Sequence, residues 1–193
     1  DHRDLHSFPT RRSSDLLLMP ESIILTGPMG SGKTSVGQLL AARLGYRFQD
    51  LDALLVEQAG KSINQIFADE GEAAFRERET ALLATLVGQH GIILSTGGGV
   101  VIREANRRLL HAGGLVVNLT ATVPVLAGRL ALADDRPLLK GDEALEARIE
   151  RIMTEREPFY ADADIRIDTT GKTLEDVAAE ILAVYAEKRS GAL

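Results

Sequence analysis

The segment at residues 27–34, GPMGSGKT, has the residue types and spacing of a phosphate-binding site. It matches the pattern G-x-x-x-x-G-K-[ST] in full. Glycines let the backbone curl so that its N–H groups converge on phosphate oxygens, and a helix that begins there adds its positive N-terminal dipole. We expect Lys33 to bridge the β- and γ-phosphates of a nucleotide and the Thr34 hydroxyl to ligate Mg²⁺. The residues expected to contact the nucleotide phosphates are Gly30, Ser31, Gly32, Lys33, Thr34 and Ser35.

A dinucleotide-binding loop is the main alternative for this segment. That fingerprint needs glycine or alanine at position 35, where the chain has Ser35, and it has no use for Lys33. The apolar run before the loop and the helical pattern after it also favour a phosphate loop. Because GTPases, ATPases and metabolite kinases share such a loop, it identifies neither the base nor the group that accepts the phosphate.

Two aspartates, Asp50 and Asp52, follow the short strand expected at residues 46–49. Many phosphate-loop proteins place a magnesium-supporting aspartate after a later strand, but here residues 92–96 end in hydroxyls. Aspartates at i and i+2 after a strand can divide two tasks: one holds metal-bound water, and the other accepts a hydrogen bond from an acceptor hydroxyl. A turn followed by a helix cap is the plain alternative. The position at the carboxyl end of a strand, where open α/β sheets bind ligands, favours the functional interpretation.

Three consecutive glycines, Gly97, Gly98 and Gly99, follow the apolar run at 92–95. Such a stretch forgoes side-chain packing, which makes sense where backbone N–H groups must approach an anion closely. On the helix expected at 71–89, Arg76 and Glu79 lie at i and i+3, so the glutamate can orient the guanidinium toward a carboxylate. Taken alone, this pair is more often a solvated pair on a helix surface.

Short apolar runs alternate with longer helical patterns from Met19 onward. This order predicts an α/β protein, with a three-layer fold like that of phosphate-loop NTPases: a central five-stranded parallel sheet and helices on both faces. The expected strands are 23–25, 46–49, 92–95, 115–119 and 165–167. The expected helices are 33–44, 52–59, 62–69, 71–89, 104–111, 122–132, 142–156 and 173–188.

The composition restricts what the chain can bind. With a net charge of −6, it is not expected to bind nucleic acid broadly, so anionic substrates require a local cluster of cations. There is no cysteine, which excludes disulfides and thiolate chemistry, and no apolar run long enough to span a membrane. Residues 1–18 are polar and without periodicity. We expect them to be a disordered, non-native extension, with residues 19–193 forming one domain.

Over about residues 22–185 the chain resembles shikimate kinases, because six motifs occur in the family's order and spacing. The matching segments are GPMGSGKT (27–34), DLD (50–52), FRERE (75–79), STGGG (95–99), DRPLL (135–139) and REPFY (156–160). The resemblance implies transfer of the γ-phosphoryl of ATP to the 3-hydroxyl of shikimate, with Mg²⁺ as cofactor. It also implies a cytoplasmic monomer whose partners are these two small molecules.

The resemblance also implies roles for individual residues. Lys33, Asp52 and Arg136 would be catalytic, with Arg136 on a mobile lid around 133–141. Thr34 and Asp50 would serve Mg²⁺, and Arg129 and Arg136 would join the phosphate loop in binding ATP. The expected shikimate contacts are Asp52, Arg76, Gly97, Gly98, Gly99 and Arg156. The stretch 168–173 lacks a proline found in some members, which leaves the adenine contacts open.

Two alternative functions are weaker. A kinase for another hydroxy acid, such as gluconate, would share the phosphate loop and lid, but the FRERE and STGGG motifs argue against it. A non-catalytic nucleotide-binding regulator is expected to have lost one of the residues that perform phosphoryl transfer. Lys33, Asp50, Asp52 and Arg136 are all present.

Overall fold

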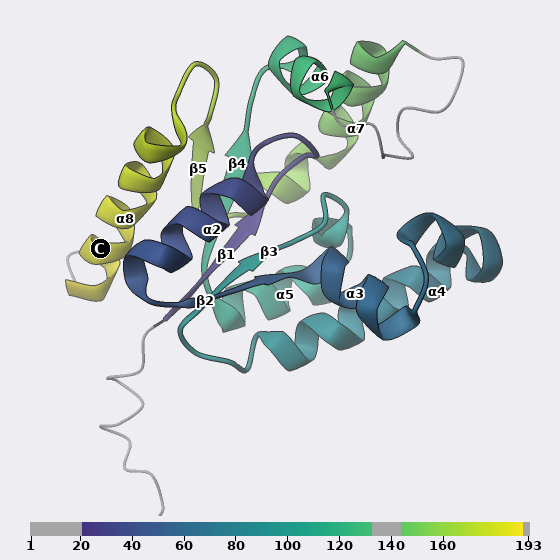
Figure 1. Ribbon diagram of the computed structural model, residues 1–193, viewed down its shortest axis with the longest axis horizontal. Coiled ribbons are helices and arrows are strands. Elements are labelled where there is room, and N and C mark those ends of the chain that lie inside the picture. The colour runs from purple at the N-terminus through teal and green to yellow at the C-terminus, as the bar shows by residue number, and fades with distance from the viewer. Residues whose placement is uncertain (1–20, 133–143, 191–193) are drawn as a thin grey trace, which may run out of the picture.

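A computed structural model describes residues 21–132 and 144–190 of the chain (Figure 1). Its centre is a sheet of five parallel strands in the order β2-β3-β1-β4-β5. The strands are β1 (Ser22–Thr26), β2 (Arg47–Asp50), β3 (Ile92–Ser95), β4 (Gly114–Thr120) and β5 (Ile165–Asp168). The predicted five-stranded parallel sheet is thus confirmed. The predicted extension at 1–18 and the predicted lid at 133–141, with Arg136, lie outside the described residues.

Helices cover both faces of the sheet, which completes the predicted three layers (Figure 1). One face packs against α2 (Lys33–Leu44) and α8 (Leu174–Ser190), and the other against α3 (Leu51–Ala59), α4 (Ile63–Leu86) and α5 (Glu104–Gly113). Two further helices, α6 (Val123–Ala131) and α7 (Leu145–Tyr160), pack together beyond the carboxyl ends of the strands. A 3₁₀ turn, η1 (Val100–Ile102), precedes α5.

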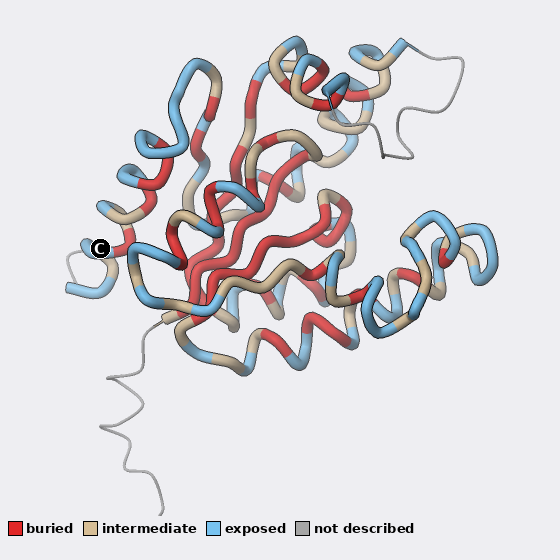
Figure 2. Tube along the Cα trace, viewed as in Figure 1, coloured by how far each residue is buried: buried red, intermediate tan, exposed pale blue. Residues whose placement is uncertain are grey.

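The central strands contribute apolar side chains to both layers because successive residues point to opposite faces. Ile23 and Leu25 of β1 lie in the core under α2 and α8, whereas Ile24 between them lies in the core with α4 and α5. Figure 2 shows the result: the central strands β3, β1 and β4 are buried, whereas the edge strands β2 and β5 are partly exposed. This two-sided burial explains why the central strands read as continuous apolar runs rather than alternating ones.

Two helix boundaries differ from the sequence prediction. The predicted break between 62–69 and 71–89 is present as a kink at Gly71 (φ 84°, ψ 169°) inside α4, but α4 ends at Leu86. The predicted helix 142–156 ends too early, since α7 continues through Pro158 to Tyr160. The added turn carries Tyr160 into the core, and this burial offsets the backbone hydrogen bond that the proline removes. None of the described helices combines the length and apolar character needed to cross a bilayer.

Packing of α2 against the sheet sets the position of the phosphate loop, so we predict that Leu40→Ala destabilises the protein strongly. Leu40 is fully buried in the core beneath α2. The expected loss is about 2–5 kcal/mol in the free energy of unfolding, measured by urea denaturation. The exposed neighbour Gln38 provides the control: Gln38→Ala should change it by less than about 0.5 kcal/mol. Equal effects of the two variants would contradict this account of the core.

Candidate active site

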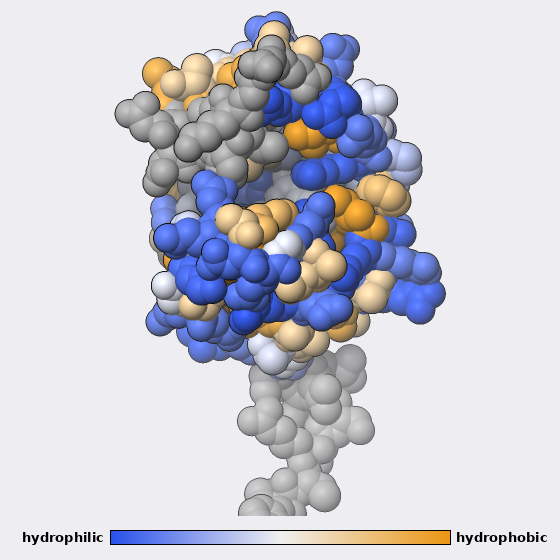
Figure 3. Space-filling view, turned by 90° about the vertical axis from the view of Figure 1, so that its right-hand side faces the viewer, coloured by the Kyte–Doolittle hydropathy of each residue, from blue (hydrophilic) through white to orange (hydrophobic). Residues whose placement is uncertain are grey.

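The candidate site lies where β1, β2 and β3 end side by side. Leu25 of β1 and Asp50 of β2 are both in register with Ser95 of β3. The three segments that follow these residues therefore begin at the same level of the sheet. They are the phosphate loop, the start of α3 and the triglycine segment 97–99. Seen from the side of α4, the surface is mostly hydrophilic and is hollowed near its middle (Figure 3).

The phosphate loop is held in a closed, curled form by its own side chains. Lys33 is buried, and its Nζ donates to the carbonyl oxygens of Gly27 and Pro28, both at 2.8 Å. Ser31 Oγ donates to the Pro28 carbonyl at 2.8 Å. Gly32, at the N-cap of α2, has φ 95°, a left-handed conformation that favours glycine. The loop is therefore curled, with the Lys33 ammonium bonded to its carbonyl oxygens.

Arg129 of α6 ties the phosphate loop to the segment after β5. Its Nη1 donates to the Gly30 carbonyl at 3.1 Å and to Thr169 Oγ1 at 3.0 Å. Thr169 Oγ1 in turn donates to the Thr120 carbonyl at the end of β4. Arg129 was expected to bind ATP, but its contact with Thr169 was not predicted. Thr169 lies in the stretch 168–173, where the adenine contacts could not be predicted from the sequence.

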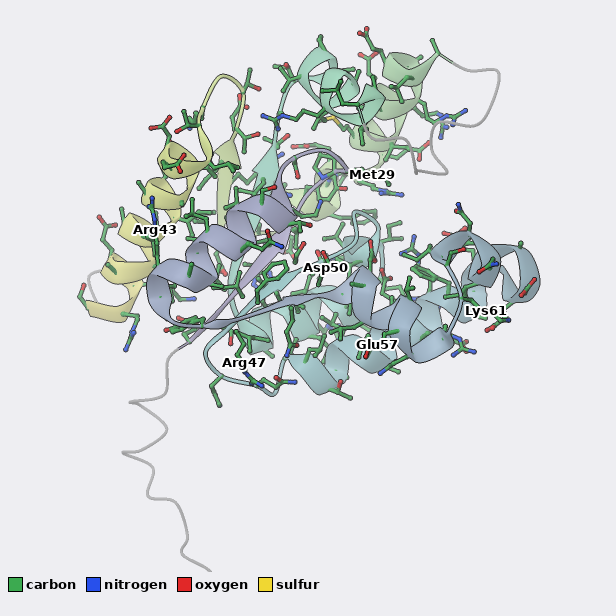
Figure 4. All side chains as sticks on the ribbon, viewed as in Figure 1. Met29, Arg43, Arg47, Asp50, Glu57 and Lys61 are labelled. Atoms are coloured by element: carbon green, nitrogen blue, oxygen red, sulfur yellow. The ribbon has the colours of Figure 1, made fainter. Side chains whose placement is uncertain are left out.

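Thr34 and Asp50, the predicted metal pair, meet across the gap between α2 and β2. Thr34 Oγ1 donates to Asp50 Oδ2 at 3.2 Å, while Asp50 Oδ1 accepts from the Ala53 N–H at 3.1 Å and caps α3. Figure 4 shows Asp50 below the loop that carries Met29. Asp50 is thus a helix cap, as the plain alternative proposed, and it also faces the phosphate loop.

The donor set at this pair fits Mg²⁺ rather than a metal held by protein alone. No group of three or more His, Cys, Asp or Glu side chains within residues 21–132 and 144–190 could hold a metal ion. Mg²⁺ usually keeps several waters and binds through one or two protein oxygens together with substrate phosphates. A threonine hydroxyl and a carboxylate beside a phosphate loop meet this requirement.

The triglycine segment is closely approached by the charged side chains that the resemblance selected. A Cβ placed on Gly97 would lie 2.8 Å from Asp52 Oδ1. One placed on Gly98 would lie 3.4 Å from Arg156 Nη1. Asp52 comes from the first turn of α3 and Arg156 from α7, so residues more than a hundred positions apart converge on one short backbone segment.

The third contact is the tightest. A Cβ on Gly99 would overlap the guanidinium of Arg76, which is only 13% exposed. Arg76 Nη1 donates to Glu79 Oε2 at 2.8 Å, and Glu79 is 1% exposed. The predicted orienting pair is therefore buried beside the glycines rather than solvated on a helix surface. Burial raises the pKa of the Glu79 carboxyl, and the Arg76 charge opposes that rise.

One contact at the triglycine segment was missed in the sequence analysis. The hydroxyl of Tyr160 donates to the Gly98 carbonyl at 2.7 Å. Tyr160 lies one helical turn after Arg156, and both belong to the REPFY segment. The i, i+4 spacing was therefore available as a signal that the two side chains share a face of α7.

The fold and the phosphate loop define a phosphate-loop nucleotide-binding protein. A family model described as shikimate kinase matches residues 29–186. Shikimate kinases of Geobacter metallireducens and Geobacter sulfurreducens are 56% and 55% identical to the chain. The first match covers 87% of this chain and 93% of the relative, and the second 86% and 91%. The chain belongs to the shikimate kinase family.

Solved structures agree with this assignment. A shikimate kinase from Acinetobacter baumannii in complex with shikimate matches with a TM-score of 0.83 and 35% identity, covering 91% of this chain and 98% of that one. A gluconokinase from Sinorhizobium meliloti matches with a TM-score of 0.61 and 20% identity, covering 90% and 96%. The second likeness shows a shared fold alone.

The Thr34–Asp50 pair yields a prediction about magnesium. Asparagine caps helices as well as aspartate does, so Asp50→Asn should keep α3 but lose the charge that faces the metal position. We expect the affinity for ADP with Mg²⁺ to fall about 10-fold or more, and the affinity in EDTA to be unchanged, by calorimetry. Asp164→Asn is the control, because Asp164 also accepts from a backbone N–H, that of Val116, at the opposite end of the sheet. Equal losses with and without Mg²⁺ would contradict the metal role.

Proposed function

We propose that this protein is a shikimate kinase, which transfers the γ-phosphoryl of ATP to the 3-hydroxyl of shikimate and yields shikimate 3-phosphate and ADP. The observation that carries the proposal is the triglycine segment 97–99, flanked by one carboxylate and two guanidinium groups beside a phosphate loop. Shikimate is a small ring with three hydroxyls and one carboxylate. A site for it needs a hydrogen-bond acceptor for a hydroxyl and cations for the carboxylate, and both occur here.

On the nucleotide side, the amides of the curled loop and the Lys33 ammonium bind the β- and γ-phosphates. The ammonium exchanges its two carbonyl partners for phosphate oxygens. This part of the site comprises Gly30, Ser31, Gly32, Lys33, Thr34 and Ser35. Arg129 binds near the adenine. Thr34 and Asp50 would hold Mg²⁺, the aspartate through water, and the ion would supply positive charge to neutralise the transferring group.

On the acceptor side, Arg76 and Arg156 bind the shikimate carboxylate, and the Gly97–Gly99 backbone lies against the ring. Asp52 accepts a hydrogen bond from the acceptor hydroxyl and so orients its oxygen toward the γ-phosphorus. The bond from phosphorus to the β,γ-bridging oxygen breaks as the bond to the 3-oxygen forms. Because the transition state is loose, positioning and charge stabilisation dominate the catalysis.

Arg136, in the DRPLL segment, is the third catalytic residue of the proposal. It comes over the transferring phosphate from a lid at 133–141 and stabilises its charge. This role rests on the family motif. We further propose that the protein acts in the cytoplasm as a monomer in aromatic amino-acid synthesis, with ATP and shikimate as its partners and without nucleic acid or membrane.

The first test is ADP release from Mg-ATP with shikimate, with gluconate and with neither, using the chain begun at Met19. Release that depends on shikimate alone is expected. Release with gluconate would favour the alternative kinase. Intact ATP binding without acceptor-dependent release would favour a non-catalytic regulator.

Gly99→Ala tests the close approach on which acceptor binding depends. Gly99 has φ −95°, which alanine adopts freely, and the atoms nearest to the added methyl all belong to the Arg76 guanidinium. We expect the KM for shikimate to rise about 10-fold or more, equivalent to roughly 1.4 kcal/mol, and the KM for ATP to stay within twofold. Gly88→Ala is the control, since a Cβ there meets nothing within 4 Å. An unchanged KM for shikimate in Gly99→Ala would remove Arg76 from the acceptor site.

A further inference from the structure

The hydroxyl of Tyr160 is the one side-chain group that hydrogen-bonds the triglycine backbone within the described residues. We propose that Tyr160 is a positioning residue for the acceptor: it fixes the Gly98 peptide and Arg156 in the arrangement that receives the shikimate carboxylate. The inference rests on the proposed function and assigns no chemical step to the phenol. Its support is the hydrogen bonding of the glycines, the burial of the phenol and the position of Arg156.

The carbonyl oxygens of the three glycines are all used within the protein. Those of Gly97 and Gly99 accept from the backbone N–H groups of Val100 and Ile102, each at 3.2 Å. The Gly98 carbonyl accepts instead from the Tyr160 hydroxyl at 2.7 Å. The N–H groups of residues 97–99 donate to no other residue in the described part of the chain. The carbonyl oxygens of the segment thus accept hydrogen bonds from the protein, while its N–H groups remain available to a ligand. Tyr160 supplies the hydrogen bond to the middle carbonyl, that of Gly98.

The Tyr160 hydroxyl is buried in an environment that keeps it protonated, so that it can donate a hydrogen bond. Tyr160 is 2% exposed, and its ring packs in the core shared by β1, β3 and α4. Burial raises the pKa of the phenol above its usual value, and the nearby Arg156 opposes that rise. The hydroxyl therefore keeps its proton at neutral pH and donates it to the Gly98 carbonyl, while its oxygen lies beside Arg156.

Arg156 and Tyr160 occupy successive turns of α7, so one helix supplies both a cation for the carboxylate and the anchor for the glycines. A Cβ on Gly98 would be 3.4 Å from Arg156 Nη1 and 3.6 Å from the Tyr160 hydroxyl. Removing the hydroxyl leaves the Gly98 carbonyl without its donor and Arg156 without this neighbour. The nucleotide is expected to contact the phosphate loop and Arg129. Within the described residues the Tyr160 hydroxyl donates to Gly98 and to neither of these, so the main effect should fall on the acceptor.

Tyr160→Phe removes only the oxygen and keeps the ring in the core. Tyr185→Phe is the control: Tyr185 is 3% exposed, and its hydroxyl donates to the Glu21 carbonyl at 2.7 Å and also hydrogen-bonds the Tyr46 hydroxyl at 2.7 Å. Each variant leaves one carbonyl without a side-chain donor, so both should lower the Tm, by about 2–8 °C. The decrease in Tyr185→Phe should be at least as large, because that variant also loses the bond to Tyr46. Tyr160→Phe alone should raise the KM and the calorimetric Kd for shikimate about 10-fold. Its kcat and KM for ATP should stay within twofold.

The inference is overturned if Tyr160→Phe binds shikimate as tightly as Tyr185→Phe does. A parallel decline of kcat, both KM values and Tm in Tyr160→Phe would also overturn it, since that pattern marks a general structural role. The wild-type protein separates this inference from the proposed function. If it fails to phosphorylate shikimate, the proposed function fails; if it succeeds and the two variants match, only the role of Tyr160 fails.

Discussion

The acceptor side of the site depends on how closely charged side chains approach the backbone at residues 97–99. Any side chain at Gly97 or Gly99 would occupy the space of the Asp52 carboxylate or the Arg76 guanidinium. This close approach is possible because the carboxyl ends of β1, β2 and β3 are level, with Leu25 and Asp50 both in register with Ser95. A shift of one residue in the register would turn the side chains of β2 to the opposite face and separate Asp50 from Thr34. The register of the sheet therefore sets the relative positions of the residues that follow its strands.

Cationic side chains gather at the site although the protein as a whole carries a negative net charge. The chain carries a net charge of −6, yet Lys33, Arg76 and Arg156 gather around the site. Cations removed from water require partners: Lys33 donates to backbone carbonyls, and Arg76 is paired with Glu79. The cost of burying Glu79 is visible in the raised pKa of its carboxyl. An anionic ligand beside Arg76 would share a cation that is already held in place, so little side-chain entropy is lost on binding.

Much of this architecture was predictable from the sequence, because local pattern and tertiary structure agree there. The buried strands appear as apolar runs, and the motif at 27–34 carries its own geometry. What escaped prediction depends on contacts between distant segments. The extension of α7 through Pro158 follows from the burial of Tyr160, and the tie between Arg129 and Thr169 follows from the proximity of α6 to the end of β5. Asp50 was predicted as either a cap or a metal partner, and only the structure shows that one carboxylate serves the cap with one oxygen and Thr34 with the other.

Helix α7 packs at one end beside the phosphate loop and at the other end beneath α4 and η1, so it fixes the position of one relative to the other. Near its start, Ile149 packs in the small core that also contains Leu126 and Leu130 of α6, beside Met29 of the phosphate loop. At its end, Tyr160 packs in the core beneath α4 and η1. Arg156 lies between these two anchors, so packing at both ends of α7 fixes its place beside Gly98. A helix that ended at residue 156 would lose the second anchor, and the final turn through Pro158 is therefore as much a part of the site as the arginine that it supports.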